Sequence, residues 1–181
     1  MTSEIASPAS EVRIMMDSLN QMERLLEEIA ENVDGDVDLY MIGGGAMMYL
    51  GGKLQTKDLD LVVRSADEYS RAFGALIRMG FESTRLGAGY DKMNLSGILE
   101  DGTGRRIDLF NDRVCRKLRL SEGMASRSVV RCVRGGITLR TVAPEDILIF
   151  KSITERPGDR EDCMRSWRRC RILTGTPSSP K

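Results

Sequence analysis

Hydrophobic side chains recur at helical spacing near the start of this chain. Apolar residues three or four positions apart run through residues 11–32, and glutamates occupy the remaining positions of the helical wheel. The pattern predicts a long amphipathic helix that ends at Asp-Gly-Asp, residues 34–36. A continuous apolar run at residues 37–42 then predicts a buried strand, which leads through three glycines into a short helix over residues 46–50.

The rest of the chain alternates between strand-like and helix-like patterns. Gly-containing turns join two pairs of apolar segments and predict two hairpins, and a proline at the first turn of a later segment favours a helix. The expected strands are residues 58–63, 93–99, 105–110, 128–133 and 137–142, and the expected helices are residues 66–79, 144–153 and 159–173.

This order of elements favours an α/β or α+β fold, a mixed β-sheet flanked by helices with a small C-terminal helical segment. We expect a flexible N-terminus over residues 1–10 and one domain over residues 11–173. Its core spans residues 37–142, and its C-terminal helices span residues 144–173. The Ser/Pro/Gly-rich tail, residues 174–181, is expected to be disordered.

The composition narrows the possible chemistry. The chain contains no histidine, which excludes His-based triads and histidine general bases. Its four cysteines form no C-x-x-C pair, which argues against a zinc site. No apolar run approaches the ~18 residues of a membrane span, and the start lacks the pattern of a signal peptide. We therefore expect a cytoplasmic protein.

The net charge is zero, but it is unevenly distributed. Residues 1–38 hold ten acidic and two basic side chains, a balance of −8, whereas residues 113–140 hold eight basic and one acidic, a balance of +7. Such asymmetry is typical either of a surface for a polyanion or of internal pairing between an acidic helix and a basic half. The scarcity of aromatic residues for base stacking favours internal pairing.

Three aspartates in strand-like contexts are the main chemical signal. Asp58 and Asp60 alternate in one predicted strand and should project in parallel, and a neighbouring strand carrying Asp108 would bring a third carboxylate. Three carboxylates on one sheet face repel one another unless cations compensate, and Mg²⁺ prefers such oxygen ligands. Asp108 could instead pair with Arg105 or Arg106, although we judge the strand alternation unfavourable for both.

The three glycines at residues 43–45 follow a strand and open a helix, an arrangement in which backbone N–H groups can face phosphate. A P-loop is excluded because Leu54 follows Gly52 and Lys53, and a dinucleotide fingerprint is weak because Met48 replaces its third glycine. The specific signal is the combination of strand, glycine turn, helix and D-x-D on the next strand.

Five segments in this order resemble the polymerase-β-type nucleotidyltransferases, most closely the AbiEii-like and related minimal members. The similarity covers most of the chain. The segments are Ile-Gly-Gly-Gly-Ala at 42–46, Thr-Lys-Asp-Leu-Asp-Leu at 56–61, Ile-Asp-Leu at 107–109, Pro-Glu-Asp-Ile-Leu-Ile-Phe-Lys at 144–151 and Arg-Pro-Gly-Asp-Arg-Glu-Asp at 156–162.

The resemblance implies a two-metal mechanism that uses Mg²⁺ or Mn²⁺. Asp58 and Asp60 would hold the metal against the triphosphate of an NTP such as ATP. Asp108 would complete the second metal and help to take the proton from the attacking hydroxyl. Gly44 and Gly45 would present N–H groups to the phosphates.

The resemblance also implies that Thr56 and Lys151 contact the nucleotide. Lys151 could equally be a solvated helix residue. Arg156, Asp159 and Asp162 fit a structural cluster better than a ligand set, because Asp159 stands where a helix N-cap belongs.

Two classes of function follow from this sequence. The first is an enzyme that transfers a nucleotide to a hydroxyl of a protein, a tRNA or a small molecule, related to toxin–antitoxin nucleotidyltransferases and possessing a cognate partner protein. The second is a nucleotide-binding or interaction module with weak catalysis, which the short C-terminal extension and Ala46, in place of a hydroxyl residue, encourage. A plain nucleic-acid-binding protein is a third option.

Overall fold

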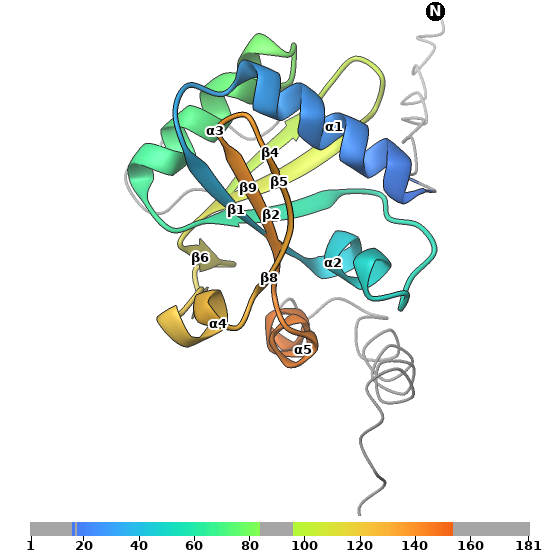
Figure 1. Cartoon of the computed structure of the whole chain (residues 1–181), viewed down its shortest axis with the longest axis vertical. Helices are drawn as coiled ribbons and strands as arrows, with labels where there is room; N and C mark the ends of the chain where they lie inside the picture. Colours follow the sequence, from blue (N-terminus) through green and yellow to red (C-terminus); the bar gives the residue numbers. More distant parts are fainter. Residues whose placement is uncertain (1–15, 17, 84–95, 154–181) are drawn as a thin grey trace, which may run out of the picture.

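A seven-stranded mixed sheet forms the centre of the computed structural model, which describes residue 16, residues 18–83 and residues 96–153 (Figure 1). The strands follow the order β3-β4-β5-β2-β1-β9-β8. The pairs β1/β9 and β2/β5 are parallel and the others are antiparallel. The sheet strands are β1 (Val37–Ile42), β2 (Leu59–Val63), β3 (Glu82–Ser83), β4 (Ser96–Glu100), β5 (Arg106–Asn111), β8 (Val129–Arg134) and β9 (Ile137–Thr141).

Five helices and a small separate hairpin complete the described part of the chain. The helices are α1 (Leu19–Asn32), α2 (Gly43–Tyr49), α3 (Ala66–Arg78), α4 (Glu122–Ser126) and α5 (Pro144–Ser152), and the hairpin is β6 (Arg113–Val114) with β7 (Leu118–Arg119). None of the described helices is both long and apolar enough to cross a membrane.

The mixed sheet flanked by helices confirms the predicted fold class. The strand at 37–42, the helix at 66–79 and the hairpin of residues 128–133 and 137–142 are present with ends shifted by at most one residue. The helix predicted over 144–153 is α5. The predicted helix at 159–173, the N-terminal ten residues and the tail lie outside the described residues.

The first helix is shorter than its hydrophobic pattern predicts. Met16 is not helical: its backbone exchanges two hydrogen bonds with Thr56, of 2.9 and 3.0 Å. Ser18 then caps α1, because its side chain accepts a hydrogen bond from the Gln21 N–H. The apolar period continues across this break, so periodicity alone could not place the start. Residues 11–15 lie outside the described part.

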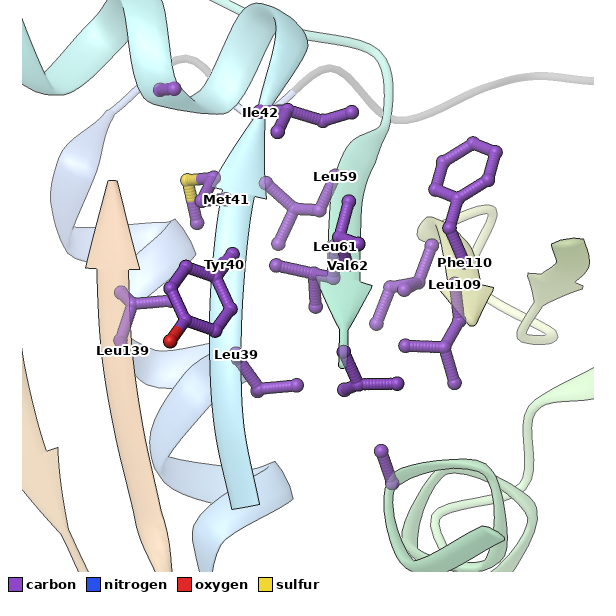
Figure 2. Close-up of a cluster of buried hydrophobic side chains, with 14 of the residues drawn as sticks. Leu39, Tyr40, Met41, Ile42, Leu59, Leu61, Val62, Leu109, Phe110 and Leu139 are labelled. Carbon is purple, nitrogen blue, oxygen red and sulfur yellow. The ribbon is translucent and has the colours of Figure 1, made fainter. Parts of the chain in front are cut away.

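Leucine-rich strands pack one face of the sheet against α1 and α3. Leu39, Met41, Leu61 and Leu109 are almost fully buried, and the strand register aligns them on this face (Figure 2). The α3 side chains Tyr69 and Phe73 approach Gly97 of β4, which is paired with Leu109. The helices α1 and α3 lie side by side across the sheet (Figure 1). Side chains alternate along strands, so Asp60 and Asp108 belong to the opposite face.

The short elements between residues 112 and 126 were not predicted. Three non-glycine residues there have positive φ, namely Asp112 at 62°, Cys115 at 52° and Arg116 at 61°. Such left-handed residues carry no sequence signal of the strength that glycine gives. Two-residue strands and a five-residue helix are also too short to show a hydrophobic period.

Candidate active site

Two of the predicted aspartates are direct neighbours across the sheet. The parallel pairing of β2 with β5 aligns Asp60 with Asp108, on strands that lie ~4.8 Å apart. Asp58 immediately precedes β2, two residues before Asp60. The register that sequence analysis required for Asp60 and Asp108 is therefore confirmed.

Gly43 lies directly against the carboxylate of Asp60. The antiparallel pairing of β1 with β2 places Ile42 opposite Asp60, so the next residue, Gly43, begins α2 beside that side chain. Gly43 has a φ of +59°, and a Cβ atom there would lie 2.9 Å from Asp60 Cγ and closer still to Oδ2. Only glycine fits both this φ and this space. The glycine run forms the first turn of α2, not a loop before it.

The other two glycines have different neighbours. A Cβ on Gly44 would lie 3.1 Å from Thr56 Cβ, still closer to its hydroxyl, and 3.5 Å from Lys53 Nζ. A Cβ on Gly45 would lie 2.8 Å from Met41 Sδ, so this glycine permits close packing. Gly44 therefore faces the polar side of the turn, where the Lys53 ammonium lies.

Thr56 is buried, and its hydroxyl donates a 2.9 Å hydrogen bond to the backbone carbonyl of Asp58. Its backbone is also held by Met16. Thr56 thus fixes the segment that leads into Asp58. This contact gives the predicted site residue a positioning role for the first aspartate.

Asp108 is almost completely buried and is held by Arg106. Arg106 Nε donates to Oδ1 at 2.8 Å and Nη2 donates to Oδ2 at 2.9 Å, a bidentate pair. The expectation that strand alternation disfavours this pair was wrong for Arg106, because residues two apart in a strand share a face. Arg105 points the other way, toward Asp101 and Glu28, at 2.6 and 2.8 Å.

Arg106 is surrounded by negative charge. Its hydrogen bond to Asp108 raises the pKa of the guanidinium above its usual value, against the lowering by burial, and the charges of Asp108, Asp58 and Glu100 raise it further. Glu100 Oε1 lies 3.9 Å from Arg106 Nη1, opposite it on β4. A permanently charged guanidinium therefore stands among the acidic groups of this face.

These residues match a hard divalent cation in donor type. Asp58, Asp60 and Asp108 offer oxygen atoms only, as Mg²⁺ or Mn²⁺ requires. Within the described residues, however, no three Asp, Glu, Cys or His side chains are arranged as a metal-binding group. Both oxygens of Asp108 are instead engaged by Arg106.

Lys151 lies near the end of α5 and is largely buried, so it is not the solvated helix residue of the alternative interpretation. The helix α5 packs against α2, whose first turn contains the glycines. The fully buried Asp146 accepts hydrogen bonds from Arg127, one of 2.8 Å from Nε, and this pair ties the start of α5 to the end of α4. Arg156, Asp159 and Asp162 lie outside the described residues.

Sequence analysis missed Gly43 and Arg106 as site residues. Three consecutive glycines gave no indication of which one meets Asp60. The spacing Arg-x-Asp at residues 106–108 was available as a signal, because two-residue spacing in a strand predicts side chains on one face.

The fold is similar to that of solved nucleotidyltransferase structures, and no protein-family model or curated protein sequence matches the chain. The crystal structure of ANT(2'')-Ia in complex with adenylyl-2''-tobramycin has a TM-score of 0.53 and 15% identity, over 86% of this chain and 90% of that chain. A solution structure of the same antibiotic-resistance factor also has a TM-score of 0.53 and 15% identity, over 88% and 91%.

A crystal structure from Thermotoga maritima, of a protein assigned to the nucleotidyltransferases, has a TM-score of 0.54 and 12% identity, over 83% of this chain and 94% of that chain. At these identities the comparisons establish a shared fold. The chain thus shares the fold of solved nucleotidyltransferases, as predicted, and these comparisons do not show the expected closer similarity to the AbiEii-like members.

Proposed function

We propose that this chain is a metal-dependent nucleotidyltransferase of the polymerase-β type that moves a nucleoside monophosphate from an NTP to an acceptor hydroxyl. The observation that carries the proposal is the alignment of Asp60 with Asp108, with Gly43 against Asp60. These three residues lie in a fold that the chain shares with ANT(2'')-Ia.

Asp58, Asp60 and Asp108 would hold Mg²⁺ or Mn²⁺, which supplies positive charge against the triphosphate and the departing pyrophosphate. The acceptor oxygen forms a bond to the α-phosphorus while the bond to the bridging oxygen breaks. Pyrophosphate leaves with that electron pair. The proton of the acceptor hydroxyl passes to Asp108.

The glycine turn and two lysines would bind the phosphates. The N–H groups of Gly44 and Gly45 are the proposed backbone donors, and Thr56 keeps Asp58 in place beside them. Lys53 lies beside Gly44 and supplies a point charge, and Lys151 is the second proposed cation.

A small molecule with hydroxyl groups is the favoured acceptor. The structure of ANT(2'')-Ia contains an adenylylated tobramycin, and this chain matches most of that protein's length. The basic stretch that would suit tRNA is partly used internally, since Arg119 pairs with Asp112, Arg127 with Asp146, and Arg134 with Glu27. A protein or tRNA acceptor, with a toxin–antitoxin relation and a cognate partner, rests on motif resemblance alone.

A second candidate is a nucleotide-binding module with weak catalysis. It is favoured by one observation, the occupation of both Asp108 oxygens by Arg106, in a structure whose described residues contain no assembled metal-binding group. The two candidates differ in whether label is transferred or only bound.

The test is incubation with each α-³²P-labelled NTP and Mg²⁺ or Mn²⁺, with aminoglycosides, total tRNA or cell lysate as acceptors. We expect label on an acceptor with wild type and a loss of at least ~100-fold in Asp58→Ala/Asp60→Ala. Metal-dependent NTP binding without transfer would select the second candidate. Absence of both binding and transfer with folded protein would refute the proposal.

A further inference from the structure

We propose that Arg106 is an internal counter-cation that competes with the divalent cation for Asp108. The inference rests on the proposed function, since it concerns the cation site of that function. Arg106 is a positioning residue here: it holds Asp108 when the metal is absent, and it releases the carboxylate when the metal binds.

The contacts of Arg106 support a pair that is strong yet able to exchange. The guanidinium meets Asp108 through two donors at 2.8 and 2.9 Å, and its side chain is 13% exposed. Both partners are therefore shielded from water, which strengthens the interaction. A cation that takes an oxygen of Asp108 must replace at least one of these hydrogen bonds.

Arg106 also has a second carboxylate within reach. Glu100 lies opposite it on the neighbouring strand β4, with Oε1 3.9 Å from Nη1. A shift of the guanidinium toward Glu100 would keep its charge compensated while Asp108 turns to the metal. The cost of a buried unpaired arginine, which would otherwise block the exchange, is thereby reduced.

Competition predicts that removing Arg106 strengthens cation binding. Without the guanidinium, Asp108 stands unpaired beside Asp60, and the mutual repulsion of the carboxylates increases the gain from binding a cation. Removing a neutral or distant group would give no such gain. The effect must also require Asp108, because that side chain is the object of the competition.

The experiment is a titration of metal-free protein with Mn²⁺, in which free Mn²⁺ is followed by electron paramagnetic resonance, with no nucleotide present. We expect Arg106→Gln to bind Mn²⁺ on the order of ten-fold more tightly than wild type. Arg106→Lys should show a smaller gain, because an ammonium cannot form the bidentate pair. In the Asp108→Asn background, Arg106→Gln should give no gain.

The matched control is Arg105→Gln. Arg105 precedes Arg106 on the chain but pairs with Asp101 and Glu28, so its removal should leave Mn²⁺ affinity unchanged. Circular dichroism checks folding, and Arg106→Lys carries the test should Arg106→Gln fail to fold. Equal or weaker Mn²⁺ binding by folded Arg106→Lys and Arg106→Gln overturns the inference, as does a gain that persists with Asp108→Asn.

The result also separates this inference from the proposed function. Tighter Mn²⁺ binding by Arg106→Gln without nucleotidyl transfer by wild type would support the competition and refute the enzyme. Transfer that depends on Asp58 and Asp60, with Mn²⁺ affinity unaffected by Arg106→Gln, would refute the competition and keep the enzyme. Absence of Mn²⁺ binding by every variant also overturns the competition.

Discussion

Glycine is required at position 43 for two reasons, the backbone conformation and the position of the Asp60 carboxylate. Its φ of +59° lies in the left-handed region, and its missing side chain leaves the space that Asp60 occupies. Any other residue would meet both penalties at once, one in backbone strain and one in displacement of Asp60. These penalties can be separated experimentally, because another glycine of the same segment has only the first.

We predict that Gly43→Ala reduces nucleotidyl transfer by at least ~100-fold, because the new methyl group forces Asp60 away from its position. The cost in unfolding free energy should be about 1–2 kcal/mol from the positive φ alone, and more if the clash is not relieved. The measurements are the single-turnover transfer rate and urea unfolding of the same preparations.

Gly51→Ala is the matched control for this prediction. Gly51 has a φ of +66° with open space where a Cβ would stand, so it carries the backbone strain without the clash. It should lose about 1–2 kcal/mol of stability and keep its transfer rate. Equal losses of activity in the two variants would attribute the loss to the backbone strain that they share, and would contradict a role for displacement of Asp60.

At the scale of elements, the turn between β4 and β5 keeps the Asp108 strand in register. Asp101 Oδ1 accepts hydrogen bonds from the Thr103 N–H at 3.0 Å, the Thr103 hydroxyl at 2.7 Å and the Arg105 N–H at 2.9 Å, and Oδ2 accepts one from Arg105 Nε at 2.6 Å. Burial raises the pKa of Asp101. The hydrogen bonds from Arg105 and Thr103 and the positive charge of Arg105 have the larger, opposite effect, so the pKa of this carboxyl lies below its usual value.

We predict that Asp101→Asn costs about 2 kcal/mol of stability at neutral pH, because the negative charge that strengthens the hydrogen bonds of this side chain is removed. A carboxyl whose pKa is lowered in the folded state contributes stability above its unfolded pKa of ~3.9, and this contribution is lost as the pH falls through the folded value. The difference between wild type and Asp101→Asn should therefore be constant above about pH 5 and shrink at lower pH. Urea unfolding from pH 3 to pH 8 measures it.

The comparison for this pH series is Asp67→Asn. Asp67 lies on the surface in an i,i+4 pair with Arg71, at 2.6 Å. Such exposed pairs contribute little, so the variant should differ from wild type by less than ~0.5 kcal/mol throughout. A difference between Asp101→Asn and wild type that did not shrink in acid would mean that the carboxylate is not the stabilising group.

At the scale of the whole molecule, sequence patterns predicted most strands, the two hairpins β4/β5 and β8/β9, and the neighbouring strands that carry Asp60 and Asp108. These features were predictable because buried strands are apolar and glycine turns are distinct. The pairing of β1 with β2 and β9 was not predicted, because these contacts join segments that no short turn connects. The start of α1 was missed because the helical period of apolar residues extends to the N-terminal side of Ser18. The helix begins only after Ser18, which caps it, because Met16 is paired with Thr56. The pair of Arg106 with Asp108 was wrongly predicted to be unfavourable, whereas residues two apart in a strand share a face and can pair along it.

The uneven charge is another property of the whole chain, and sequence left two interpretations of it. In the structure the acidic helix α1 contacts basic residues from distant segments. Glu27 Oε1 lies 2.6 Å from Arg134 Nη1 on β8, and Glu28 Oε2 lies 2.8 Å from Arg105 Nη1. These ion pairs support internal pairing, because each joins the acidic segment to a part of the chain more than 70 residues away.

We therefore predict that Glu27→Gln/Glu28→Gln lowers the free energy of unfolding by about 1 kcal/mol at low salt, since partly exposed pairs contribute ~0.2–1 kcal/mol each. The loss should shrink in 1 M NaCl, where screening removes most of the attraction. Glu31→Gln, on the same helix and with no ion pair to another described residue, should change stability by less than ~0.5 kcal/mol. The other interpretation, a polyanion surface, would be favoured if wild type bound tRNA at physiological salt with a dissociation constant below ~1 µM, the tight end of non-specific binding.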